Sequence, residues 1–153
     1  MNVEFINPFI TSLLNVLEMM GHTELTAEKP KIKKNVVSMG DISGLIGMVG
    51  PKTKGSLSIT FEKSLALRIM LRMLGERKNE IDEEVIDMVG EITNMVSGGA
   101  KKELSIKGYE FDMATPMIVS GANHTIDHIH DGHVIIIPFS SDSGKAFIEI
   151  CFD

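Results

Sequence analysis

The sequence has a single cysteine and no long apolar run, and each shortage excludes a class of protein. Cys151 cannot form a disulfide within the chain, and such sparse cysteine is typical of a reducing compartment. It lies in the apolar run 147–152, which indicates a small core residue rather than a nucleophile. No signal peptide is visible, and no apolar stretch approaches membrane-spanning length. We therefore expect a cytoplasmic protein.

Positive charge and familiar nucleotide or metal motifs are scarce as well. The 153 residues carry a formal net charge of −6, and only the short segment 29–34 is locally basic. Nucleic-acid partners require a basic surface, so they are not expected. Glycine-rich nucleotide loops, a serine elbow and paired zinc cysteines are absent from the sequence. The length fits one domain over residues 1–153, with no linker or internal repeat visible.

A long helix predicted over residues 79–108 organises the rest of the chain. Asn79 is its expected N-cap, and acidic residues fill the first turns, where negative charge suits the helix dipole. Lysines followed by Gly108 mark its expected end. One face is apolar at spacings of three and four residues, which predicts burial against a core. That face consists of Ile81, Val85, Met88, Val89, Ile92, Met95, Val96 and Leu104.

The opposite face of this helix carries a stripe of four residues, Asp87, Glu91, Asn94 and Gly98. Glu91 and Asn94 are three residues apart and therefore project side by side toward solvent. A Glu-x-x-Asn pattern alone is weak evidence for a functional site, because in most proteins such a pattern simply forms part of a solvated helix face. Gly98 strengthens it, because a glycine inside a helix costs about 1 kcal/mol relative to alanine. A partner pressing against a surface without side chains would explain that cost.

Two further Glu-x-x-Asn pairs and a second glycine are interpreted differently. Glu4 with Asn7 and Glu76 with Asn79 have the same spacing, but we expect both pairs at helix starts rather than on a helix face. Gly99 points to the core side of the long helix, where we expect close packing on the sheet.

The remaining sequence predicts two shorter helices and several strands. One helix is expected over 7–21, with Asn7 as its cap and Pro8 at its first position. The other is expected over 64–74 and stopped by Gly75. Strands are expected at 32–38, 41–49, a half-exposed 56–61, 109–119 interrupted at Pro116, 133–139 and 145–152. The predicted class is α+β (mixed α/β), a mainly antiparallel sheet with a long helix and two shorter helices packed against it.

Histidines gather late in the chain. The cluster contains His124, His128, His130 and His133, with Asp127 and Asp131 nearby. On a strand, His128 and His130 would share a face. The spacing matches no zinc pattern, so we interpret the cluster as a polar loop and expect no bound metal. The eleven methionines, many of them on helix faces, are interpreted as adaptable core filler.

The run Asp87-x-x-x-Glu91-x-x-Asn94, followed by Pro116, resembles the signature of the CheC/CheX/FliY chemotaxis phosphatases. Within that family the chain looks like the CheX members, through NPFITSLLNVLEMMG, DISGLIGMVG, KGSLSITF and HVIIIPF. The likeness therefore covers nearly the whole chain. It implies hydrolysis of the aspartyl phosphate of the response regulator CheY. The regulator would supply its own Mg2+, so no cofactor of the chain's own is expected.

The resemblance also implies roles for single residues. Asn94 would position the attacking water, and Glu91 would anchor the regulator. Asp87, Gly98 and Pro116 would contribute to partner binding.

Assembly and the number of sites follow from the same resemblance. CheX members pair as dimers through their sheets, which implies a homodimer, and apolar strands at 44–49 and 134–139 would need pairing at any open edge. Two-site members of the family carry a second helical Glu-x-x-Asn, and because we expect none here, a single site is predicted. The alternative is a non-catalytic binding module, related to a flagellar switch protein, that docks a partner through the same stripe.

Overall fold

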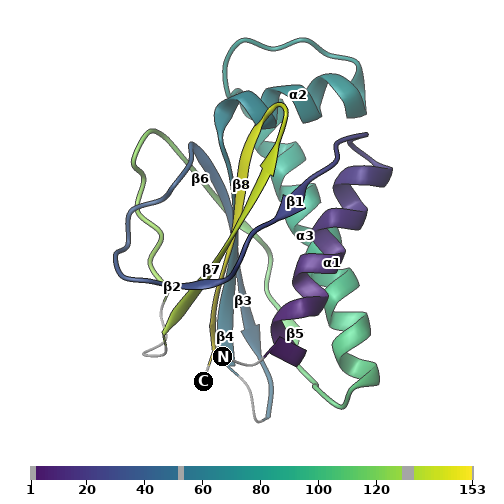
Figure 1. Cartoon of the computed structure of the whole chain (residues 1–153), viewed down its shortest axis with the longest axis vertical. Coiled ribbons are helices and arrows are strands. Elements are labelled where there is room, and N and C mark those ends of the chain that lie inside the picture. The colour runs from purple at the N-terminus through teal and green to yellow at the C-terminus, as the bar shows by residue number, and fades with distance from the viewer. Residues whose placement is uncertain (1–2, 52–53, 129–132, 153) are drawn as a thin grey trace.

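The computed structural model describes residues 3–51, 54–128 and 133–152, which form one sheet with helices packed on one of its faces. Two long helices, α1 (Val3–Met19) and α3 (Glu83–Ile106), run antiparallel over that face, and α2 (Lys63–Leu74) lies across one end (Figure 1). The predicted α+β class is confirmed. None of the helices in the described ranges is long and apolar enough to cross a membrane.

Every strand pairs antiparallel in an eight-stranded sheet of order β1-β7-β8-β4-β3-β5, in which β2 also pairs with β7 and β6 with β3. The strands are β1 Thr26–Ala27, β2 Lys31–Lys33, β3 Ile42–Val49, β4 Lys54–Phe61, β5 Asp112–Met113, β6 Met117–Ser120, β7 Val134–Ser141 and β8 Gly144–Phe152. The strand expected over 32–38 shortens to β2, because the Asn35 side chain accepts a hydrogen bond from the Val37 N–H (3.1 Å) and turns the backbone. The apolar strands β3 and β7 have neighbours on both sides, so neither forms an open edge that would need pairing.

The sheet consists of two equivalent halves, although the sequence shows no repeat. The first half runs α1, β1, β2, β3, β4 and the second runs α3, β5, β6, β7, β8. Exchanging the halves leaves the strand order unchanged, since the hairpin of each half is bordered by the short strands of the other. The halves meet where β4 pairs with β8, from Gly55 opposite Phe152 to Phe61 opposite Ala146. An internal two-fold axis therefore relates them, and α2 connects them.

The first helix begins earlier than predicted, whereas the second ends where expected. α1 starts at Val3 rather than at Asn7, so Pro8 lies inside the helix, where its missing N–H removes one internal hydrogen bond. α2 ends at Gly75, which adopts a left-handed φ of 70° and donates its N–H to the Leu71 carbonyl.

The long helix begins four residues later than predicted. α3 starts at Glu83 and is capped by Asp82 rather than by Asn79, because the Asp82 carboxylate accepts a hydrogen bond from the Val85 N–H at 3.1 Å. The helix ends at Ile106, and Gly108 then adopts the left-handed conformation expected of a stop signal, with φ 95°. The helix has 24 residues rather than the 30 predicted, and Ile81 lies before it. The rest of the predicted apolar face is buried, except Met95, which is partly buried.

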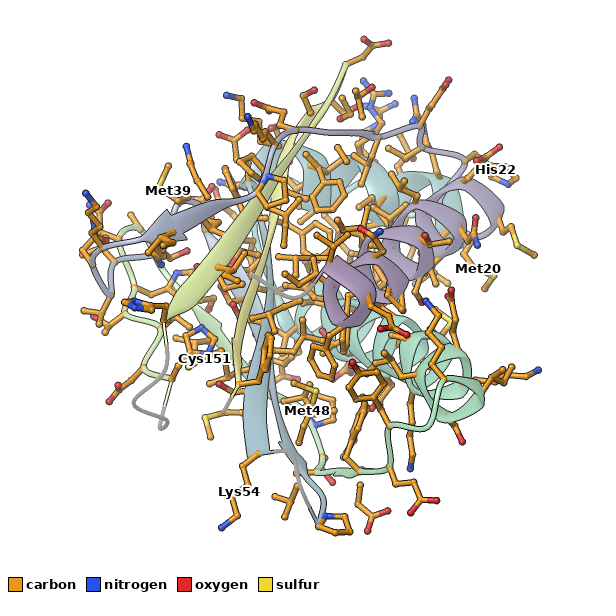
Figure 2. The ribbon with its side chains drawn as sticks, turned by 60° about the horizontal axis from the view of Figure 1, so that its bottom comes forward. Met20, His22, Met39, Met48, Lys54 and Cys151 are labelled. Atoms are coloured by element: carbon orange, nitrogen blue, oxygen red, sulfur yellow. The ribbon has the colours of Figure 1, made fainter. Side chains whose placement is uncertain are left out.

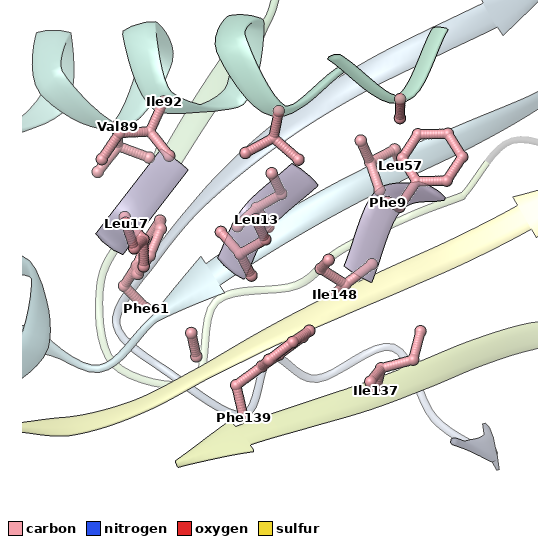
Figure 3. Packing of buried hydrophobic residues seen from close by; sticks show 14 of the residues in the cluster. Phe9, Leu13, Leu17, Leu57, Phe61, Val89, Ile92, Ile137, Phe139 and Ile148 are labelled. Carbon is pink, nitrogen blue, oxygen red and sulfur yellow. The ribbon is translucent and has the colours of Figure 1, made fainter. Parts of the chain in front are cut away.

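The hydrophobic core fills the space between the helices and the sheet (Figure 3). Each long helix contributes a stripe of fully buried side chains, and the strands contribute every second residue, as the period of a strand requires. The close view labels Phe9, Leu13, Leu17, Leu57, Phe61, Val89, Ile92, Ile137, Phe139 and Ile148. This packing holds α3 over β3 and β6.

The sheet face away from the helices is also buried. Ser56, Ser58 and Thr60 of β4 belong to that face, yet none is more than 4% exposed. Segments from both halves of the chain cover it, and they meet where Val37 pairs with Thr125 in an isolated β-bridge. The prediction of a half-exposed β4 is therefore wrong, because its polar residues alternate toward a second, polar buried layer and not toward solvent.

Candidate functional site

The four predicted stripe residues lie together on the outer surface of α3. Asp87, Glu91, Asn94 and Gly98 are all exposed, in agreement with the sequence analysis. The opposite side of the helix is buried at Val85, Met88, Val89, Ile92, Thr93, Val96, Ser97, Ala100 and Leu104. Because Glu91 and Asn94 lie one turn apart, their carboxylate and amide groups reach toward the same region of solvent.

The backbone beneath Asn94 is held by its neighbour in the sequence. Thr93 is completely buried, and its hydroxyl donates a hydrogen bond to the Val89 carbonyl at 2.8 Å. Its side chain sits over Gly44 of β3, where a methyl group would overlap the Thr93 hydroxyl. The glycine thus lets α3 approach the sheet closely at this point. Sequence reasoning missed this pair, because no local pattern connects residues so far apart.

Pro116 precedes β6, a strand that contacts α3. It is half-buried between β5 and β6, and β6 pairs with β3 under α3. Ile118, two residues further on, lies beneath Gly90, where its side chain would be 3.7 Å from an added methyl group. The strand that follows Pro116 thus contacts α3 next to Glu91.

The polar side chains of the stripe have no partner among the described residues. Across the described ranges, Asp87, Glu91 and Asn94 take part in no side-chain hydrogen bond or ion pair. Exposed polar groups without an internal partner are free to bind one from outside. This is the arrangement expected of a binding or catalytic surface.

The acidic start of α3, by contrast, is neutralised internally. Lys78 contacts Glu84 at 2.8 Å and Asp82 at 2.9 Å, and Lys63 contacts Glu80 at 2.8 Å. Hydrogen bonds to Glu84 and Asp82 raise the pKa of the Lys78 ammonium group. The same bonds are the main reason that the pKa values of the Asp82 and Glu84 carboxyl groups are lowered. Three of the acidic groups around the start of α3, those of Glu80, Asp82 and Glu84, are therefore paired, unlike those of the stripe.

The two adjacent glycines of α3 have different surroundings. A methyl group on Gly98 would meet no atom within 4 Å, so nothing in the described part of the fold requires glycine there. A methyl group on Gly99 would lie 2.5 Å from the Ser12 hydroxyl of α1, which donates to the Val96 carbonyl at 2.8 Å. Gly99 therefore packs against α1, and the expectation that it packs on the sheet is wrong.

An open apolar groove of about 350 Å3 lies between α1 and α3, next to the stripe. Val16, Met19 and Met20 of α1 and Met95 of α3 contribute to its walls. Met19 is 74% exposed and Met20 46%, so the interpretation of methionines as core filler is wrong for these two. Flexible, polarisable side chains of this kind suit an adaptable contact surface.

Two of the clustered histidines are built into the polar layer behind the sheet. His124 is 9% exposed, with Nε2 2.7 Å from the Ser43 hydroxyl and Nδ1 2.8 Å from the Gly121 carbonyl. His128 lies between the Ser56 hydroxyl (2.5 Å) and the Glu149 carboxylate (3.2 Å). Both rings are thus held by internal hydrogen bonds.

The rest of the histidine cluster offers no assembled metal site in the described ranges. His133 is exposed, whereas His130 and Asp131 lie outside the described residues. In the part of the chain that is described, no group of three or more His, Cys, Asp or Glu side chains could hold a metal ion. His128 lies outside every strand, so the expected pairing of His128 with His130 on a strand face has no support.

The other Glu-x-x-Asn pairs differ from each other. Glu76 and Asn79 lie in the connection between α2 and α3 and outside any helix. Glu4 and Asn7 both lie within α1, and both are exposed. Glu4 lies in the first turn of α1 and Asn7 one turn later, so the prediction that this pair falls at a helix start is confirmed.

Comparison with known proteins gives a consistent result. The family model described as "Chemotaxis phosphatase CheX" matches residues 42–140, which include the stripe. A CheC-like superfamily protein of known structure from Shewanella sp. PV-4 is 67% identical, with a TM-score of 0.95, over 100% of this chain and 99% of that one.

Two more distant relatives have names that describe an activity or a complex. The CheY-P phosphatase CheX of Thermotoga maritima is 26% identical over 148 residues, which are 96% of this chain and 94% of the relative. A structure of the CheX–CheY–BeF3–Mg2+ complex from Borrelia burgdorferi matches at 26% identity and a TM-score of 0.82, over 99% of each chain.

Proposed function

The chain belongs to the chemotaxis phosphatase CheX family, and we propose on that premise that it hydrolyses the aspartyl phosphate of a CheY-type response regulator. Asn94 positions the attacking water and Glu91 anchors the regulator. One observation carries the assignment: Glu91 and Asn94 lie one turn apart on an exposed helix face, without a partner in the described part of the chain. The family membership supports the proposal that the chemistry occurs on that face. Because the proposed partner is a CheY-type response regulator, we propose that the protein acts in the cytoplasm.

The chemistry suits an amide beside a carboxylate. A water oxygen bonds to phosphorus, the bond from phosphorus to the aspartyl oxygen breaks, and inorganic phosphate leaves while aspartate keeps the electron pair. An acyl phosphate has a good leaving group, and its transition state is loose, so the orientation of the water decides the rate. The neutral Asn94 amide accepts a hydrogen bond from that water without adding negative charge beside the phosphoryl oxygens.

Glu91 acts on the partner rather than on the water. Its carboxylate, one turn before Asn94, is free to pair with a lysine of the regulator in a charge-assisted contact. Asp87 extends the acidic surface by one further turn, and Gly98 allows the regulator to approach the helix backbone. Pro116 supports this surface from below.

The Mg2+ ion comes with the regulator. The Borrelia burgdorferi complex contains CheY, BeF3 and Mg2+ together with CheX. BeF3 stands in for the phosphoryl group in such a complex, and the metal neutralises charge on that group. This chain therefore needs no cofactor of its own.

We also propose that the chain forms a homodimer. Several large apolar side chains are exposed on the segment that covers the polar sheet face, namely Ile32, Val36, Val37 and Met39, each between 42% and 54%. Met39 lies well away from Met20 and the helices (Figure 2). Such a patch is a natural interface between copies, and it leaves the α3 stripe open. Light scattering at micromolar protein tests this, and a monomeric mass would contradict it.

The decay of phosphorylated CheY tests the assignment and the alternative of a binding module. Asn94→Ala should slow the reaction at saturating regulator, because a lost polar contact of this kind costs about 2–4 kcal/mol, roughly two to three orders of magnitude. Its affinity for a BeF3-loaded regulator should change little. Glu91→Ala should weaken affinity as well. Asn79→Ala, an exposed asparagine off the helix, is the matched control.

Both variants should keep the melting temperature of the parent protein, since both residues are exposed. If the folded Asn94→Ala protein keeps its rate, the water-positioning role is wrong. If the parent protein binds the regulator but leaves its decay unchanged, the chain is a binding module.

A further inference from the structure

One end of the apolar groove between α1 and α3 lies beside the stripe. Ser12 and Gly99 face each other across the two antiparallel helices. Met19, the last residue of α1, lies about two turns after Ser12, and Glu91 lies about two turns before Gly99. Because both helices rise equally per residue, Met19 and Glu91 are level with each other along the helix pair. The methionine end of the groove is therefore the end next to the proposed site.

The wall of the groove on α3 also borders the stripe across the helix surface. Met95 lines the groove and follows Asn94 directly in the sequence. It lies one turn after Glu91, and residues four apart on a helix are surface neighbours, so the two side chains adjoin. A molecule that contacts both Glu91 and Asn94 thus lies against the edge of the groove.

The groove exposes apolar side chains that the core of this chain does not bury. Met19 is 74% exposed and Met20 46%, whereas Val16 and Met95 are partly buried against the core. Covering such side chains removes apolar surface from water, which stabilises a complex. The flexible thioethers can adapt to the shape of the side chain that covers them.

The charges beside the groove suit a partner that carries positive charge. The two helices contain no lysine or arginine over residues 3–19 and 83–100. On the α3 side, Asp87 and Glu91 supply exposed carboxylates that have no partner among the described residues. An apolar groove bordered by carboxylates is complementary to an apolar side chain that has a lysine or arginine next to it.

We propose that the groove binds an apolar side chain on the surface of the CheY-type regulator, next to a lysine or arginine, while the phosphoryl group lies at the stripe. This rests on the function assigned above to α3. Every phosphorylated regulator presents the same phosphoryl group to the stripe, so the stripe alone does not select among related regulators. The groove contacts a side chain that differs between regulators, and a polar side chain there would leave Met19 and Met20 without an apolar contact. The groove therefore determines which regulator docks.

The test measures binding and turnover separately. Met19→Ser with Met20→Ser should raise the Kd for BeF3-loaded CheY roughly tenfold, which corresponds to about 1.4 kcal/mol. The KM for phosphorylated CheY should rise by a similar factor while kcat stays unchanged, because the contact is the same before and during the reaction. Met19→Leu with Met20→Leu should keep the parent values, since the apolar contact remains. Ile106→Ser, at an 83% exposed apolar residue that ends α3, is the matched control and should leave Kd unchanged.

A cross-link identifies what occupies the groove. Cys151 is buried, so a benzophenone maleimide should label the Met20→Cys variant at position 20 alone. Irradiation with BeF3-loaded CheY should join the label to a CheY segment that has an apolar side chain next to a lysine or arginine. Mass spectrometry of the digested product locates that segment.

An unchanged Kd in the folded Met19→Ser, Met20→Ser protein overturns the role of the groove. A cross-link to a second copy of this chain, or to a CheY segment without such an apolar and basic pair, overturns it as well. If CheY binds but the parent protein does not accelerate its decay, the function assigned to α3 is wrong, and the Kd and the cross-link still decide the role of the groove. Melting temperatures of all variants separate a lost contact from a lost fold.

Discussion

Gly44 of β3 lies directly beneath Thr93 of α3, the residue that precedes Asn94. A methyl group on Gly44 would overlap the Thr93 hydroxyl and lie 3.0 Å from the Thr93 Cβ. Thr93 cannot yield easily, because it is fully buried and its hydroxyl donates to the Val89 carbonyl. The height of the helix above the sheet, and hence the position of Asn94, is set at this contact.

Gly44→Ala should therefore both destabilise the protein and impair the site. Overpacking of a buried contact costs about 1–3 kcal/mol, and the displaced helix should carry Asn94 out of position. Denaturant unfolding and the decay of phosphorylated CheY measure the two effects. Gly47→Ala in the same strand is the control, because a methyl group there would meet no atom within 4 Å. Equal stability of the two variants would contradict the role of Gly44.

Gly98→Ala should separate stability from binding. It should stabilise the helix by about 0.5–1 kcal/mol, because no neighbour obstructs a methyl group and alanine is the better helix former. It should also weaken the affinity for a BeF3-loaded regulator, which titration calorimetry measures. A variant that is more stable and binds as tightly as the parent would show that no partner approaches at Gly98.

Gly99→Ala should have the opposite effect on stability. Its methyl group would crowd the Ser12 hydroxyl and separate α1 from α3. Ser12→Ala should restore most of the loss in the double variant, so a double-mutant cycle measures the contact. Additive losses would contradict direct packing of the two residues.

Glu149→Ala should be strongly destabilising. Its carboxylate is 1% exposed and binds Lys33 at 2.7 Å and His128 at 3.2 Å. Removal of one partner leaves Lys33 uncompensated inside the protein, which typically costs about 3–5 kcal/mol. Chemical denaturation measures the loss, and Glu110→Ala, at an exposed position, is the control. A loss below about 1 kcal/mol would show that water reaches this layer.

The carboxyl group of Asp82 should make the stability of the protein depend on pH. Hydrogen bonds from Lys78 and from the Val85 N–H lower the pKa of its carboxyl group, so its contribution is complete above its unfolded pKa of about 4 and is lost as the pH falls through the lowered value. Asp82→Asn keeps a capping oxygen but loses the charge. Melting temperatures of this variant and the parent should differ most at neutral pH and converge in acid. A gap that stays constant down to pH 2 would contradict the assignment.

The spacing of apolar residues predicted most of the helices and strands. Most errors concern residues that are buried by segments distant in the sequence. The apolar face of α3 and its exposed stripe followed from spacing alone, because a helix repeats every 3.6 residues. The burial of Ser56, Ser58 and Thr60 could not be predicted from the sequence. Alternating polar residues predict a strand face exposed to solvent, and they do not show that distant segments cover that face. Asn79 and Asp82 are equally good caps by type, and the ion pairs of Lys78 favour the second.

The internal repeat escaped the sequence for a related reason. Most equivalent buried positions of the two long helices differ in identity: Phe5 corresponds to Ile92, and Leu13 to Ala100. Glu91 and Asn94 were identified by likeness to a family, whereas Thr93 and Gly44, which position them, carry no signal that a single sequence displays.

The β4–β8 pairing at the centre of the sheet has a consequence for how the protein is made. β8 leaves the ribosome after every other strand, yet it lies between β4 and β7, and its partners on β4 are about 90 residues earlier in the chain. Until it emerges, the hairpin of β3 and β4 waits with one edge open, and such an edge attracts other chains. The edge of β4 therefore stays unpaired until β8 is made, and the sheet is completed only when its last strand is inserted into its middle.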